Sequence, residues 1–221
     1  MDTAAHTNPA RRMDRMYRYT RHIYDLTRRP YLLGRDDVLA EIAAQPASSV
    51  LEVGCGTARN LRKLCSQAPQ HTLYGLDASD QMLATARTAC ARAGCSEAIR
   101  LIQGLAQDIQ PSLFGCTSPF DIVLCSYVLS MIPTATSVVD AALASVRSGG
   151  KVYIVDFWDQ ARWPAPARYA LQQWLAWFGV DHRQVLHRHL DALAESGYIR
   201  LSRTSVAQRY AYQAVLAKAD A

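Results

Sequence analysis

The sequence predicts an α/β protein with a doubly wound parallel sheet. Three observations favour this class: strand-like and helix-like runs alternate along the chain, a Gly-x-Gly turn follows the first strand-like run, and an acidic residue ends the second. Such alternation is typical of βαβ units, in which a helix carries the chain back to start the next parallel strand. The strand-like runs are 49–53, 72–77, 98–103, 120–126 and 150–157, and the helix-like runs lie near 57–67, 79–93 and 135–147.

Glycines and turn residues mark the expected element ends. Gly94 follows the second helix-like run and Gly149-Gly150 follow the third, and glycine is common just beyond a helix C-terminus. Near the end of the chain, the β-rich stretches YIRLSRTSV and RYAYQAVLAK flank a short turn at Ala207-Gln208. They predict a C-terminal antiparallel hairpin.

Length and composition favour one globular domain. The chain has 221 residues, of which 50% are hydrophobic and 19% charged, enough for one substantial core. No apolar run approaches the roughly 18 residues of a membrane span, and the N-terminus lacks the apolar core of a signal peptide. We expect a cytoplasmic protein, with contact at the inner membrane surface left open. The six cysteines show no Cys-x-x-Cys spacing and are expected to be buried free thiols.

Positive charge gathers near the N-terminus. The formal net charge is +5, and residues 11–35 hold eight arginines against two acids, Asp14 and Asp25. Such a segment suits an anionic membrane surface or nucleic acid. It is equally typical of a solvated helix face, and the sequence leaves these interpretations open.

The run VLEVGCGTARNL forms the first ligand-binding candidate. Gly54 and Gly56 allow backbone N–H groups to approach a ligand closely. A dinucleotide fingerprint would place a third glycine at Arg59, where none is found. The acid Glu52 would repel phosphates but suits a ligand that carries an ammonium group.

Asp77 ends the second strand-like run, about twenty residues after the glycine turn, where a carboxylate can accept hydrogen bonds from both ribose hydroxyls. Together with Glu-x-Gly-x-Gly and the later runs FDIVLCSYVLSMIP and VRSGGKVYIVDF, it makes residues 48–157 resemble the class I S-adenosylmethionine-dependent methyltransferases. The resemblance implies a seven-stranded Rossmann-like sheet and S-adenosyl-L-methionine as cofactor. It implies that Glu52, Gly54 and Gly56 line the methionine half and that Asp77, beside Ala78, binds the ribose.

Other expected ligand contacts follow strands three and four. The family often has an acid after strand three that binds the adenine amino group, but this chain has Leu105 there, and Gln107 or Asp108 is left to replace it. Ser126 and Tyr127 follow strand four, at the carboxyl edge where open α/β sheets bind ligands.

The segments around this core resemble the N-methyltransferases of betaine-lipid synthesis. They read MDRMYRYTRHIYDLTRRPYLLGRD, SYVLSMIP and VDFWDQ…WLAWFGVDHR. The resemblance implies three successive methylations of the amine of diacylglyceryl-homoserine. A lipid acceptor would bring the protein to an anionic membrane surface, to which the Arg-rich segment and Trp158, Trp163, Trp174 and Trp177 are suited.

Rival functions share the core motifs. One is methylation of a small soluble molecule, such as a quinone precursor or a secondary metabolite. Another is a nucleic-acid methyltransferase, but strand four ends in CSYVLSMIP rather than in an Asn-Pro-Pro-Tyr type of motif for a flipped base, so no nucleic-acid partner is expected. A catalytically silent cofactor-binding subunit also stays open.

Methyl transfer to an amine needs a neutral nitrogen held in line with the sulfonium methyl. A tyrosine hydroxyl near the nitrogen can orient its lone pair and receive its proton, and aromatic rings stabilise a quaternary product by cation–π attraction. We therefore expect Tyr127, and Tyr24 from the N-terminal segment, to be the catalytic residues. Tyr17 and Tyr31 are further candidates for the same space.

The expected organisation is a helical substrate or lid segment at 1–46 and a methyltransferase domain at 47–221 with a substrate-side insertion at 158–183. Within the insertion one helical stripe carries Leu171, Trp174, Leu175 and Phe178, either as core packing or as a lid over an apolar substrate. His187 and His189 would lie on different helix faces, so no metal site is expected.

Overall fold

The computed structural model describes residues 32–177, 180 and 184–219. Tyr24, Phe178 and the arginines of the N-terminal segment before Arg35 lie outside the described residues. The proposed division at residue 46 therefore stays a prediction.

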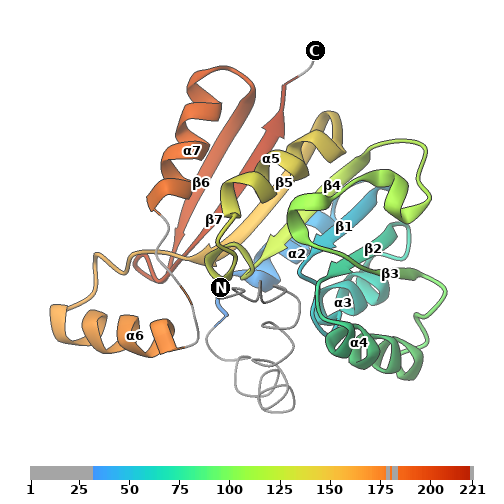
Figure 1. Cartoon of the computed structure of the whole chain (residues 1–221), viewed down its shortest axis with the longest axis horizontal. Helices are drawn as coiled ribbons and strands as arrows, with labels where there is room; N and C mark the ends of the chain where they lie inside the picture. Colours follow the sequence, from blue (N-terminus) through green and yellow to red (C-terminus); the bar gives the residue numbers. More distant parts are fainter. Residues whose placement is uncertain (1–31, 178–179, 181–183, 220–221) are drawn as a thin grey trace, which may run out of the picture.

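The described chain forms one seven-stranded sheet in the order β3-β2-β1-β4-β5-β7-β6 (Figure 1). The first five strands are parallel, and β7 runs antiparallel between β5 and β6. This arrangement confirms the predicted doubly wound sheet with its C-terminal hairpin. The strands are β1 Ser49–Val53, β2 Thr72–Asp77, β3 Ile99–Gln103, β4 Phe120–Ser126, β5 Val146–Phe157, β6 Ile199–Val206 and β7 Ala211–Lys218.

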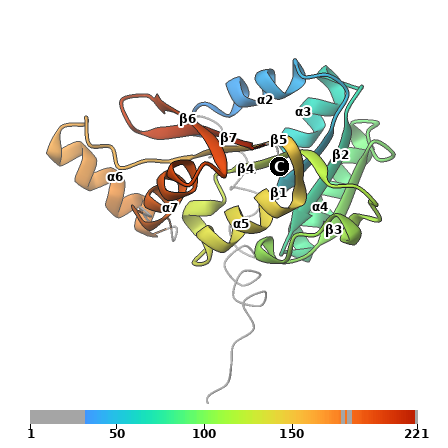
Figure 2. The same ribbon diagram turned by 90° about the horizontal axis from the view of Figure 1, so that it is seen from above.

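Helices cover both faces of the sheet, with α2 and α3 on one side and α5 and α7 on the other (Figure 2). Each face has its own apolar cluster, one including residues of α2, α3 and α4 and the other residues of α5 and α7. Because both faces are covered, the central strands are buried nearly throughout, as in β1 and β4. The helices are α2 Arg35–Ala43, α3 Arg59–Gln67, α4 Asp80–Arg92, α5 Ala135–Ser145, α6 Ala165–Trp177 and α7 Gln184–Glu195.

One expected helix stop is wrong. Helix α5 ends at Ser145, and Gly149 and Gly150 lie inside β5, where the pairing with β4 shifts from Phe120↔Val146 to Ile122↔Lys151. A Cβ on Gly150 would lie 2.8 Å from a backbone oxygen of Arg147, so the glycines serve a β-bulge. Gly94, in contrast, follows the end of α4 with φ +69° as predicted.

Several other expectations are settled by packing. All six cysteines are free thiols, and Cys65 and Cys116 are only partly buried. No helix among the described residues is long and apolar enough to cross a membrane. Leu175 is buried and Leu171 packs against the core, which confirms core packing for these two members of the α6 stripe.

Candidate active site

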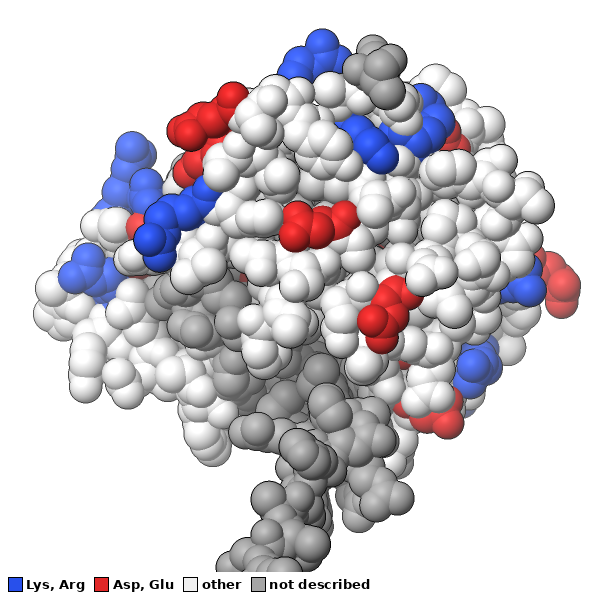
Figure 3. Space-filling view, turned by 45° about the horizontal axis from the view of Figure 1, so that its top comes forward, with Lys and Arg blue, Asp and Glu red and all other residues white. Residues whose placement is uncertain are grey.

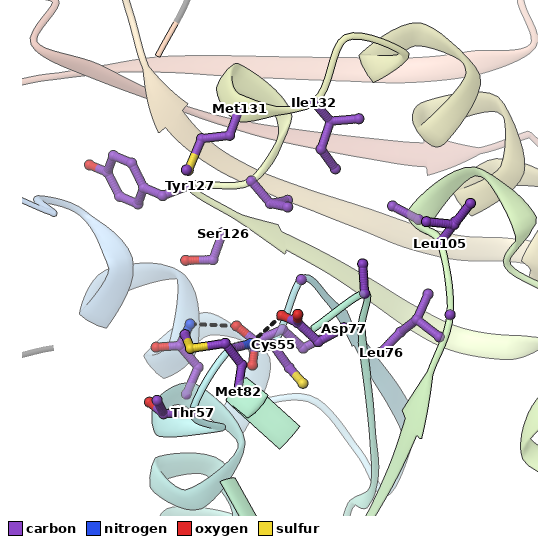
Figure 4. Close-up of a pocket in the computed structure, with 18 of the residues that line it drawn as sticks. Cys55, Thr57, Leu76, Asp77, Met82, Leu105, Ser126, Tyr127, Met131 and Ile132 are labelled. Carbon is purple, nitrogen blue, oxygen red and sulfur yellow. Dashed lines mark hydrogen bonds between the residues drawn. The ribbon is translucent and has the colours of Figure 1, made fainter. Parts of the chain in front are cut away.

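A cavity of about 460 Å³ opens at the carboxyl ends of β1 to β4. Ligands of open α/β sheets bind at this edge because the strand-to-helix loops gather there. Figure 4 shows Asp77, Cys55 and Met82 on one side of it and Ser126, Tyr127 and Met131 on the other. The sequence-predicted residues that line the cavity are Glu52, Gly54, Gly56, Asp77, Ala78, Gln107, Ser126 and Tyr127.

The glycine turn after β1 leaves no room for side chains. Gly54 has φ +67°, and a Cβ there would lie 2.4 Å from Cγ2 of Val128. Gly56 has φ +53° and its N–H donates to Oδ2 of Asp77 at 2.8 Å. The turn therefore needs glycine both for its left-handed backbone and for its close approach to the loop after β4.

The Asp77 carboxylate is held in place by backbone groups. Oδ2 accepts from Gly56, and Oδ1 accepts from the N–H of Ser79 at 2.9 Å. Ser79 is in turn the N-cap of α4, where its hydroxyl accepts from Met82 N–H. A carboxylate oriented in this way at the tip of a strand suits ribose hydroxyls, which donate hydrogen bonds to it.

Glu52 is a buried carboxyl group at the floor of the cavity, with 2% of its surface exposed. Oε1 accepts from Nδ2 of Asn60 at 2.6 Å, while Oε2 is buried and has no hydrogen-bond partner among the described residues. Burial raises the pKa of Glu52 to about 8. A buried acceptor without a partner is costly, and an ammonium group would satisfy it.

Arg35 is a cavity residue that the sequence did not single out. Its Nε donates to the carbonyl of Leu32 at 3.3 Å, and burial, followed by the nearby Arg59, lowers its pKa. Because a partly desolvated guanidinium favours an anion, Arg35 suits a carboxylate ligand. Its only signal in the sequence was membership of the Arg-rich segment, which gave no reason to separate it from its neighbours.

At the end of β3 (Ile99–Gln103), Leu105 stands where the family pattern has an acid. Leu105 lines the cavity together with Gln107, whereas Asp108 is exposed and does not line it. Of Gln107 and Asp108, the two residues left to replace the family acid, Gln107 is therefore the one that lines the cavity. Leu105 and Leu76 supply apolar surface at this end of the cavity (Figure 4).

Tyr127 lies in the cavity wall, but its hydroxyl has another partner. The hydroxyl donates to the carbonyl of Leu33 at 2.7 Å, and the ring packs edge-on against Phe157. Burial raises the pKa of Tyr127 well above its usual range, which opposes a role as general base. Ser126 Oγ is buried with no hydrogen-bond partner among the described residues, so a hydroxyl acceptor and donor remains available in the same wall.

The tryptophans and histidines that follow β5 and were named from the sequence have different surroundings in the structure. Trp158 lies against Arg209, 4.0 Å from ring centroid to Cζ, and Trp163 stacks on Tyr210, and both side chains are half-buried. His187 packs on Tyr212, whereas His189 contacts Asp140. The two histidines thus face different neighbours, and no three His, Cys, Asp or Glu side chains in the described ranges are grouped to hold a metal ion.

Comparisons with known proteins agree with this geometry. Residues 51–152 match the family described as "Methyltransferase domain". The chain is 25% identical over 118 residues to a trans-aconitate 2-methyltransferase of Azoarcus sp., covering 53% of this chain and 42% of that protein. It is 34% identical over 104 residues to a ubiquinone biosynthesis O-methyltransferase of Methylococcus capsulatus, covering 47% and 40%. The matched regions thus span less than half of either relative.

The fold comparison covers more of the chain. An O-methyltransferase family protein from Burkholderia thailandensis superposes with a TM-score of 0.69 at 14% identity, over 95% of this chain and 63% of the other. At this identity the likeness concerns the fold alone. It extends the agreement from the matched domain to the C-terminal strands and helices.

Proposed function

Because the chain carries a class I methyltransferase domain, whose family uses S-adenosyl-L-methionine, we propose that it methylates the amine of an amino-acid headgroup on a lipid, of the diacylglyceryl-homoserine kind. The bound cofactor supplies a methyl group made electrophilic by the adjoining sulfonium. The chain supplies binding, orientation and exclusion of water.

Three features of the cavity fit the cofactor. Oε2 of Glu52 is a buried acceptor that suits the ammonium of the methionine half. The Asp77 carboxylate is fixed by two backbone N–H groups and suits ribose hydroxyls. The volume of about 460 Å³ lies within the range of small-molecule sites.

The observation that carries the acceptor proposal is the mixed lining of the cavity near Tyr127. Leu32, Met131 and Ile132 are apolar, and Arg35 provides a guanidinium beside them. A lipid with an amino-acid headgroup has both an apolar body and a carboxylate. We assign Arg35 to a carboxylate, either that of the headgroup or that of the methionine half.

A small-molecule acceptor is the second candidate. Two of the relatives are called a trans-aconitate methyltransferase and a ubiquinone biosynthesis methyltransferase, and these two names denote small organic molecules or their precursors. An organic acid would use the same guanidinium of Arg35 but would not need the apolar wall.

The test offers both acceptor classes to the purified protein. Radiolabelled S-adenosylmethionine is supplied with diacylglyceryl-homoserine in detergent micelles, with free homoserine, and with trans-aconitate. Transfer to the lipid, with products carrying one, two and three added methyl groups by mass spectrometry, supports the proposal. Transfer to trans-aconitate and none to the lipid would assign the chain to the second candidate.

A further inference from the structure

Helix α6 belongs to a stretch without acids. From Gln160 to Val180 the sequence contains two arginines, Arg162 and Arg168, and no Asp or Glu, together with five aromatic residues. A solvated surface helix normally shows charged residues on its outer face. Within α6 the charged residue is Arg168, and it is half-buried.

The outer face of α6 is uncharged and rich in exposed aromatic residues. The exposed fraction is 66% for Tyr169, 37% for Trp174 and 82% for Trp177. At 100° per residue these side chains fall on one arc of the helix, and every other member of that arc is exposed and uncharged. The exposed residues of this arc, called the α6 face below, are Pro166, Tyr169, Ala170, Gln173, Trp174 and Trp177.

The opposite side of α6 is attached to the body of the protein. Leu175 is buried in the core and Leu171 packs against it. The side-chain amide of Gln172 donates to the carbonyl of Asp159 at 3.3 Å. The charged residue of the helix, Arg168, is also half-buried on this side. Because Leu171 and Leu175 hold this side against the core, the aromatic residues of the other side are exposed.

The α6 face lies at the ligand edge of the sheet. Helix α6 starts shortly after Phe157, the carboxyl end of β5, and projects past β6 and β7, away from α3 and α4 (Figures 1 and 2). A row of ring contacts leads there from the cavity, from Tyr127 to Phe157 to Tyr210 to Trp163. In Figure 3 the lower left of the surface, which is the place of α6 in Figure 1, is largely uncharged.

We propose that the α6 face docks on the interfacial region of an anionic lipid bilayer. Trp and Tyr, rather than aliphatic residues, dominate it, and these are the side chains enriched at the membrane–water interface. The exposed Arg162 lies just before the helix, and no acid in the stretch opposes attraction to anionic lipid. The proposal rests on the proposed function, because a bilayer-resident acceptor is what docking would present to the cavity.

Vesicle co-sedimentation of the full chain tests the docking. The parent is compared with Tyr169→Ser/Trp177→Ser on phosphatidylglycerol–phosphatidylcholine vesicles. We expect the vesicle partition coefficient of the double variant to fall about tenfold or more, because a loss of about 1.4 kcal/mol of binding free energy corresponds to a factor of ten. Arg162→Glu should lower it several-fold on these vesicles but not on pure phosphatidylcholine.

Two exposed apolar residues away from the α6 face serve as matched controls. Tyr198, 43% exposed, precedes β6 at the opposite edge of the sheet, and Leu113, 46% exposed, lies in a short 3₁₀ turn. Tyr198→Ser and Leu113→Ser should bind vesicles as the parent does. Circular dichroism checks that each variant is folded.

Three results would overturn the docking: no vesicle binding by the parent, equal binding by parent and double variant, or an equal loss in the controls. A change of oligomeric state in the double variant with unchanged vesicle binding would assign the α6 face to a second copy of the chain. The micelle assay keeps this inference apart from the proposed function. If parent and double variant methylate the lipid equally in micelles and bind vesicles equally, only the docking is overturned. If the double variant binds vesicles more weakly but the parent does not methylate the lipid in micelles, only the proposed function is overturned.

Discussion

The side chain of Asn60 donates to one oxygen of Glu52 at 2.6 Å and leaves the other oxygen, buried in the cavity wall, without a partner among the described residues. Asn60 stands in the first turn of α3 and Glu52 in β1. The hydrogen bond therefore fixes the orientation of the carboxyl group, so that the second oxygen can accept a hydrogen bond from a ligand. It also couples a proton to ligand binding, because burial raises the pKa of Glu52 to about 8.

We expect cofactor affinity to depend on pH through Glu52. Below about pH 8 the ligand-free carboxyl group carries a proton that an incoming ammonium must displace, so affinity should rise with pH by up to about tenfold per unit. Above this range it should fall as the α-amino group of the ligand deprotonates. Calorimetry with S-adenosylhomocysteine measures this profile, and Glu52→Gln should weaken binding and flatten the acidic limb. An unchanged limb in Glu52→Gln would assign the proton to another group.

The same carboxyl group affects the stability of the ligand-free protein. Its folded pKa of about 8 exceeds the unfolded value of about 4.3, so the folded state binds more protons between these values and loses stability as pH rises through that window. Glu52→Gln removes this loss while it keeps an acceptor for Asn60. We expect the variant to be more stable than the parent by at least about 1 kcal/mol at pH 8, measured by urea unfolding.

Asp77→Ala should weaken cofactor binding by about 1 to 3 kcal/mol, because charge-assisted hydrogen bonds to the ribose are lost. It also removes the acceptor of the Gly56 N–H. Asp108→Ala is the control, since Asp108 is exposed and does not line the cavity. Equal affinity of Asp77→Ala and parent in calorimetry would place the ribose elsewhere.

Arg35→Leu distinguishes the two sources of a carboxylate. If Arg35 holds the methionine carboxylate, affinity for S-adenosylhomocysteine should fall by about 1.5 to 3 kcal/mol, with no change for 5′-methylthioadenosine, which has no carboxylate. If it holds the headgroup, both affinities persist and the KM for the lipid rises. Arg87→Leu, exposed on α4, is the control. A variant equal to the parent in all three measurements would contradict the assignment of Arg35 to any carboxylate.

Tyr127→Phe should destabilise the protein by about 1 kcal/mol, because the hydrogen bond to the Leu33 carbonyl is lost and that acceptor is left unpaired. Tyr198→Phe, at an exposed position, should be neutral. Denaturant unfolding measures both. If Tyr127→Phe instead kept full stability and lowered kcat about 100-fold, the hydroxyl would act in the chemistry as the sequence alone suggested.

Gly54→Ala should destabilise the protein through a clash with Val128, whose Cγ2 would lie 2.4 Å from the new Cβ. Overpacking of this kind costs about 1 to 3 kcal/mol. Gly94→Ala isolates the backbone contribution, because Gly94 has a similar φ of +69° and open space around it. Gly54→Ala should lower the free energy of unfolding more than Gly94→Ala does, and adding Val128→Ala to Gly54→Ala should recover part of that excess. No recovery would mean that the strain at Gly54 is in the backbone.

The candidate site was predictable where its chemistry is local. Glu52, Gly54, Gly56 and Asp77 occupy a strand, the turn after it and the tip of the next parallel strand, so adjacency in a parallel sheet brings them together. Arg35 and Asn60 were missed because their roles depend on where α2 and the first turn of α3 come to lie. The hydrogen bond of the Tyr127 hydroxyl was not predictable for the same reason, since its acceptor, Leu33, is 94 residues away in the chain.

The sequence by itself determined the order of strands and helices, the terminal hairpin and the cofactor edge, because burial periodicity and glycine turns act within a few residues. Only the tertiary structure decided which polar groups are paired and which apolar side chains stay outside. The bulge at Gly149 and Gly150 follows from pairing with β4, and the outward direction of Trp177 follows from the anchoring of Leu171 and Leu175. Hydrogen-bond partners and exposure are properties of packed neighbours, which segments far apart in the chain supply.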